Sequence, residues 1–293
     1  MKILPIVAFV ESESFALIHR RVSKMKCCAY DTSQGLPPPP EDKRETYAKA
    51  GSVPEEKYTV SQLESLEAEY WGTLGPSERK AEQKILLGLA HLGEGNMQDS
   101  LEAFDEVVKL KGPKAYVWQR GIPLYYLGEY ESAADYFEGQ ARLYIDKFGD
   151  APSSDLLWAA ASRAQLGDPN PSRFAGLARD GNDQVLIERN PVLRCATALF
   201  EKGSSFELNA LRAVTRLDST TGLDPLGRFF YGHFYAGLWM ESVRRDSRKA
   251  HGHLRLAVSS PFGAPDDLLR KIAVQRVAGQ SALDEGADID MWV

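Results

Sequence analysis

The five histidines are the side chains best suited to hold a metal ion or to move a proton near neutral pH. Two of them, His251 and His253, lie close together in the sequence. A spacing of two places them on different faces of a helix, so they cannot share a metal ion as an i, i+4 pair does. The other three, His19, His91 and His233, stand alone. The sequence therefore predicts no metal site.

The cysteines Cys27, Cys28 and Cys195 show the pattern of neither a disulfide framework nor a CxxC metal site. An adjacent pair and one distant residue favour a reducing compartment. Cys195 lies among apolar neighbours, which is more typical of a core thiol than of a nucleophile.

Sequence motifs of catalysis are also missing. The chain contains no HExxH, no GxSxG and no GKS or GKT phosphate loop. The glycine-rich fragment from Gly93 to Gly95 follows an expected helix rather than a strand, which argues against phosphate binding. We therefore expect that the protein is not an enzyme, that it has no catalytic residue and that it uses no cofactor.

Composition and charge indicate a globular protein with little affinity for nucleic-acid backbones. The chain has 293 residues, of which 43% are hydrophobic and 26% are charged, and its formal net charge is −6. Proteins that bind through phosphate contacts need a basic surface, so nucleic acid is an unlikely partner. No uninterrupted apolar stretch reaches about 18 residues, so no membrane span is expected.

The stretch from Trp118 to Phe137 predicts two short helices joined by a turn. Small and aromatic residues recur at helical spacing on both sides of a break at Gly128: Trp118, Gly121, Leu124 and Tyr125 before it, and Ala133, Tyr136 and Phe137 after it. Gly121 and Ala133 allow two backbones to approach closely, and Phe137 fills the space beside them. We expect these three residues to be buried where the helices cross.

Four residues of this stretch recur 33 residues upstream. The pairs are Gly88 and Gly121, Gly95 and Gly128, Ser100 and Ala133, and Phe104 and Phe137. This pattern resembles the tetratricopeptide repeat, which has a period of about 34 residues. The resemblance is strong at residues 81–137 and 229–261 and weaker between them. The later segment also resembles the last repeat of tetratricopeptide-like proteins of photosynthetic organisms, through Phe234, Gly237, Met240, Ala250, Leu254, Ala257 and Pro261.

The resemblance implies an all-α fold, a right-handed superhelical solenoid of helix hairpins over residues 61–280. We expect roughly ten to twelve helices and no sheet. A first amphipathic helix, starting at Ser61, caps the open end of the stack. Pro123 lacks an N–H and is expected to bend the first helix of the central repeat. Residues 192–217 are expected to form a weaker hairpin, and residues 266–280 a last amphipathic helix.

Three segments are expected outside this domain. Residues 1–30 combine an apolar run with a basic stretch that contains Phe15, and they resemble the bipartite leader of algae with secondary plastids. They predict a plastid protein; the alternative is a disordered N-terminus on a cytoplasmic protein. Residues 31–60 are a Pro-rich linker, and residues 281–293 an acidic flexible tail.

The resemblance also implies a binding surface, because the first helix of each repeat lines the concave face of such a solenoid. The positions of this chain that match those helices are Glu82, Ile85, Leu89, Leu92, Trp118, Ile122, Tyr125, Tyr231, Phe234 and Leu238. Their apolar and aromatic character predicts a scaffold or assembly factor that binds a peptide or an amphipathic helix of another protein.

Charged residues are missing from the positions at which chaperone-binding repeats hold a C-terminal carboxylate. Ile85, Leu89 and Ile122 stand there instead of Lys and Asn, so a chaperone tail is a poor candidate. Two alternatives stay open. One is a helical-repeat RNA-binding protein of pentatricopeptide type, against which the acidic charge argues. The other is a structural subunit of a larger complex.

Overall fold

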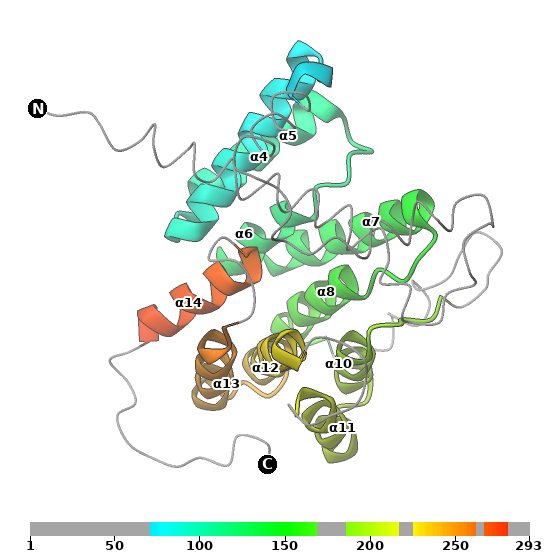
Figure 1. Ribbon diagram of the computed structural model, residues 1–293, viewed down its shortest axis with the longest axis vertical. Helices are drawn as coiled ribbons and strands as arrows, with labels where there is room; N and C mark the ends of the chain where they lie inside the picture. Colours follow the sequence, from blue (N-terminus) through cyan, green and yellow to red (C-terminus); the bar gives the residue numbers. More distant parts are fainter. Residues whose placement is uncertain (1–70, 169–185, 217–224, 262–266, 281–293) are drawn as a thin grey trace, which may run out of the picture. The chain divides into compact units, whose positions relative to one another are not determined.

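A computed structural model describes residues 71–168, 186–216, 225–261 and 267–280, and these residues are all-helical (Figure 1). They form ten α-helices and one 3-10 helix, with no strand in the described part of the chain. This confirms the predicted all-α class. The predictions for residues 1–30, 31–60 and 281–293, and for the beginning of the helix from Ser61, lie outside the described residues.

The chain divides into two compact units, Met1–Lys80 and Ala81–Val293. In the first unit, the N–H of Gly75 donates a hydrogen bond to the Glu78 carboxylate at 2.8 Å, at the start of α4. The helices are α4 (Pro76–Glu94), α5 (Met97–Lys111), η3 (Trp118–Arg120), α6 (Gly121–Tyr126), α7 (Tyr130–Phe148), α8 (Ser153–Gln165), α10 (Pro191–Lys202), α11 (Ser205–Thr215), α12 (Pro225–Ser242), α13 (Ser247–Ser259) and α14 (Leu268–Gln280).

The helices of the second unit pack mainly against their neighbours in sequence. α7 packs on α8, α10 on α11, α12 on α13 and α13 on α14. The expected hairpin at residues 192–217 is present as α10 and α11, and the expected last helix as α14. None of the described helices combines the length and the apolar character that crossing a bilayer requires.

Two helix crossings repeat the same small-against-aromatic contact. A Cβ placed on Gly88 would lie 2.9 Å from the Phe104 ring, and a Cβ on Gly121 would meet the Phe137 ring even more closely. No side chain larger than hydrogen fits at either glycine while the ring stays in place. Gly121, Ala133 and Phe137 are all buried, as predicted.

The turns that follow the first helices repeat as well. Gly95 has φ +84° and Gly128 has φ +83°, a left-handed conformation that glycine adopts without steric cost. The N–H of Gly95 donates to the Leu92 carbonyl at 3.3 Å, and the N–H of Gly128 donates to the Tyr125 carbonyl at 3.1 Å. These bonds are also in the same register, so the 33-residue spacing describes a repeated local structure.

The crossing gives a first testable prediction, on stability. Ala133 is fully buried in α7, so Ala133→Leu is expected to overpack the crossing and to lower the free energy of unfolding by about 1–3 kcal/mol. Urea denaturation measures the change. Ser132→Leu is the matched control, because Ser132 is the exposed neighbour on the same helix. Equal unfolding free energies for the two variants would contradict the packing described.

The first helix of the central repeat differs from the expected bent helix. Residues Trp118–Arg120 form a 3-10 turn, and the α-helix begins only at Gly121 and lasts six residues. Pro123 therefore lies in the first turn of α6, where its missing N–H leaves no intrahelical bond unmade. Proline has shortened this helix rather than bent it.

α8 lies in the middle of the core of the second unit. Every residue from Leu156 to Ser162 is buried, because α7, α10 and α12 all pack against this helix. Trp158 is 0% exposed, and its ring contacts four aromatic rings. The centroid distances are 5.4 Å to Tyr125, 6.1 Å to Tyr126, 5.9 Å to Phe137 and 6.1 Å to Phe234. Trp158 thus joins the central repeat to α12.

Candidate functional site

The predicted binding-surface residues divide into two groups in the structure. Six are buried: Glu82, Leu92, Ile122, Tyr125, Phe234 and Leu238. Four are partly buried against the same core: Ile85, Leu89, Trp118 and Tyr231. In this arrangement the first group offers no surface to a partner, and the second offers some. Contact of any of the ten with a partner stays a prediction.

Glu82 is buried because it serves the hairpin of α4 and α5. Its carboxylate accepts a hydrogen bond from the Lys111 ammonium at 2.7 Å. Lys111 is the last residue of α5, where a cation also interacts favourably with the helix dipole. This ion pair fastens the end of α5 to α4.

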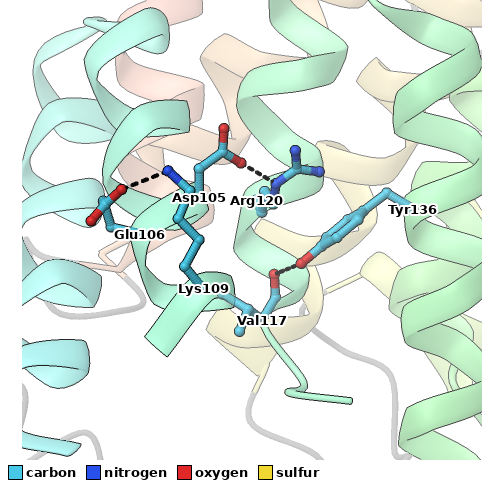
Figure 2. Close-up of polar contacts among 6 residues, drawn as sticks. All are labelled: Asp105, Glu106, Lys109, Val117, Arg120 and Tyr136. Atoms are coloured by element: carbon cyan, nitrogen blue, oxygen red, sulfur yellow. Dashed lines mark hydrogen bonds and ion pairs between the residues drawn. The ribbon is translucent and has the colours of Figure 1, made fainter. Parts of the chain in front are cut away.

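A second ion pair connects the first repeat to the central one (Figure 2). The Arg120 Nε donates to Asp105 Oδ1 at 2.6 Å, and the guanidinium carbon lies 4.7 Å from the centroid of the Tyr136 ring. The Tyr136 hydroxyl in turn donates to the Val117 carbonyl at 3.0 Å. These contacts join α5, η3 and α7, and they explain why the segment around Trp118 is held in one position.

On the same turn of α5, Lys109 and Glu106 form an exposed pair at 2.7 Å (Figure 2). Glu106 raises the pKa of the Lys109 ammonium, through a hydrogen bond first and through its charge second. This i, i+3 pair stays within one helix and joins no second element.

α14 brings polar side chains to four other helices, α4, α6, α12 and α13. The Gln275 amide donates to the carbonyl of Gly93 at 2.5 Å. Gly93 lies in the last turn of α4, where carbonyls have no partner within the helix. The Lys271 side chain lies against the same glycine. α14 therefore caps the C-terminal end of α4.

The next residue of α14, Arg276, makes the most specific of these contacts. Its guanidinium pairs with the Glu241 carboxylate of α12 and lies 5.4 Å from the centroid of the Tyr126 ring of α6. Burial raises the pKa of Glu241, and the charge of Arg276 acts in the opposite direction. We call Glu241 and Tyr126 the arginine-binding surface.

The sequence alone does not indicate this surface. Glu241 ends an apolar run in one segment, and Arg276 interrupts an apolar face in another, 35 residues away. A charged residue within an apolar stripe was the available signal, but only tertiary packing shows which charges meet.

A buried carboxyl group lies at the start of α8. Asp155 is 2% exposed, and its Oδ2 accepts a hydrogen bond from the Tyr116 hydroxyl at 2.9 Å. Its Oδ1 is buried and has no hydrogen-bond partner in the described residues. Burial raises the pKa of Asp155 to about 7, against the opposing effect of Tyr116. The group can exchange a proton near neutral pH.

Two histidines meet between α12 and α13. The Nδ1 atoms of His233 and His253 are 3.0 Å apart, so one ring donates a hydrogen bond to the other. Burial, and then the charge of His253, lowers the pKa of His233 to about 3. In the sequence, His253 stands two positions from His251, on a different face of the expected helix, and nothing indicates its contact with His233, 20 positions earlier. Among the described residues, no three potential ligands converge on a metal site.

Cys195 is partly buried and packs against the core. Burial raises the pKa of its thiol, and the charge of Arg194 offsets only part of this effect. A raised pKa makes the thiolate less available, which is in keeping with a core thiol rather than a nucleophile.

Comparisons with known proteins identify no relative of this chain. The tetratricopeptide resemblance therefore depends on the 33-residue spacing and on the crossings and turns that repeat with it. No family model, no curated protein and no solved structure matches the chain.

Proposed function

We propose that the chain is a non-catalytic interaction protein of tetratricopeptide type, which binds an amphipathic helix or peptide of another protein. Its hairpins would stack as a right-handed solenoid, as in that family. The observation that carries the proposal is the repeated hairpin. Gly88 against Phe104 and Gly121 against Phe137 have the same contact, the same spacing and the same following turn.

The partly buried aromatic residues of the first helices support this proposal. Trp118 and Tyr231 pack against the core yet keep part of their surface exposed. Large aromatic side chains that are held rigidly at a surface lose little entropy on binding, and such residues often dominate interface energies. In this chain, the ion pair of Arg120 and Asp105 holds the segment that carries Trp118.

The proposal gives a second prediction, on affinity. Trp118→Ala is expected to weaken binding of the protein partner by about thirtyfold or more, since a single aromatic anchor can contribute roughly 2–4 kcal/mol. The partner is first captured with the wild-type chain from the source organism, and its affinity is then measured for each purified variant. Phe206→Ala is the matched control, because Phe206 is 77% exposed and lies on α11.

Circular dichroism melting separates contact from folding in this experiment. Lost binding with an unchanged melting temperature supports Trp118 as a contact residue. Lost binding with a lowered melting temperature assigns Trp118 to the core instead. A capture that nuclease treatment abolishes would contradict the proposal and favour the RNA-binding alternative.

A further inference from the structure

The two halves of α14 bury different amounts of apolar surface. Leu268, Leu269, Ile272 and Ala273 of the first half are buried, and α14 packs on α13. In the second half Val274 is 43% exposed, and Ala278 and Gly279 are also exposed. There Val277 is partly buried against the core, and polar side chains make the contacts with α4 and α12. A helix end that buries little apolar surface opens more easily than an apolar core.

The surface beneath this half requires a cation. Glu241 lies in the last turn of α12, where the helix dipole disfavours a negative charge, and its side chain is only 18% exposed. A carboxylate that is removed from water in this way is costly unless a cation pairs with it. The Tyr126 ring adds a face on which a guanidinium can lie. Glu241 and Tyr126 therefore select an arginine.

Arg276 satisfies this surface incompletely. One nitrogen of its guanidinium pairs with Glu241, whereas its Nε is buried without a hydrogen-bond partner in the described residues. Arginine pairs most strongly with carboxylates through two parallel hydrogen bonds, and a buried donor without a partner is unfavourable. A helix that placed its arginine on Glu241 with both bonds would compete effectively with α14.

We infer that the arginine-binding surface of Glu241 and Tyr126 is a docking site for an arginine-bearing amphipathic helix of a partner protein, and that α14 occupies it in the isolated chain. The inference rests on the proposed function and adds the chemistry of the partner. That helix would displace the whole of α14 once its second half has opened. It would carry apolar residues three and four positions before its arginine, as the buried Ala273 and Ile272 precede Arg276.

The test uses the full chain and a labelled synthetic peptide with the sequence of Leu268–Gln280. The chain carrying Arg276→Glu repels its own α14 from Glu241, so it is expected to bind the peptide at least ten times more tightly than the wild-type chain does. Arg255→Glu is the matched control, because Arg255 is exposed on α13 and should leave peptide binding at the wild-type level.

A charge exchange tests the role of Glu241 directly. The chain carrying Glu241→Arg should reject the wild-type peptide and bind the peptide carrying Arg276→Glu. Hydrogen exchange of the Arg276→Glu chain should lose protection in α14 while α7 and α8 keep theirs. Peptide binding no tighter than to the wild-type chain would overturn the inference. So would loss of protection throughout, since α14 would then be an obligatory part of the fold.

Capture of the natural partner shows whether this inference fails on its own or together with the proposed function. We expect the Arg276→Glu chain to capture more of that partner than the wild-type chain. Equal capture by the two chains would overturn the inference and leave the proposed function standing.

Discussion

Replacing Trp158 with alanine is expected to lower the free energy of unfolding by about 3–5 kcal/mol, the range for loss of a large aromatic side chain from a core. Trp158 is 0% exposed and touches aromatic rings from α6, α7 and α12. Alanine would therefore leave a cavity at the point where helices from three parts of the chain meet. Urea denaturation, followed by far-ultraviolet circular dichroism, measures the change.

Trp158→Phe is the control for this experiment. Phenylalanine retains a ring that can stack on Phe137, whose plane is inclined by 14° to that of Trp158. Trp158→Phe should therefore lower the free energy of unfolding by less than half as much as Trp158→Ala does. A loss below about 1 kcal/mol for alanine would show that α8 is not the centre of the core.

The largest expected pH effect comes from two buried groups that act in opposite directions. His233 has a folded pKa of about 3, against 6.5 for an exposed histidine. Between these values the unfolded chain takes up a proton that the folded chain does not, so stability is lost as the pH falls. Asp155 has a folded pKa of about 7, against 3.8. Here the folded chain takes up the proton first, so stability is gained as the pH falls.

Each group contributes about 4–5 kcal/mol over its own range, so the two largely cancel in the wild-type chain. Asp155→Asn removes the gain in stability that Asp155 gives as the pH falls, and it keeps the loss that His233 causes. Between pH 6.5 and pH 4 its free energy of unfolding is therefore expected to fall by about 3 kcal/mol relative to the wild-type chain. The free energy of unfolding of the His233→Asn variant is expected to rise by a similar amount relative to the wild-type chain over the same range. Urea denaturation at several pH values measures both.

Asp146→Asn is the control for the pH series, because Asp146 is exposed on α7. Its unfolding free energy should follow that of the wild-type chain at every pH. If Asp155→Asn also followed the wild-type chain, then Asp155 would be ionised in the folded protein at neutral pH.

Local features of the fold could be predicted from the sequence. The helix crossings and the turns at Gly95 and Gly128 are set by residues less than twenty positions apart, and glycine at fixed spacing marks both. The all-helical class and the hairpin of α10 and α11 follow from helical spacing of apolar residues in the same way.

The candidate site could not be predicted, because it depends on contacts between distant segments. Trp158 meets Phe234, His233 meets His253, and Arg276 meets Glu241 only after the helices pack. The same packing explains why residues such as Tyr125 and Phe234 are buried. Both rings contact Trp158 of α8, so this helix covers them.

The hydrogen bond from Gln275 to Gly93 joins residues 182 positions apart. In an ideal repeat array, each unit touches only its neighbours, so one end can fray while the other stays folded. The bond between α14 and α4 makes the stability of α14 depend on the hairpin of α4 and α5. It also cannot form until the intervening helices are in place, because closing so long a loop costs entropy before any contact repays it. Docking of α14 is therefore expected to be a late step in folding.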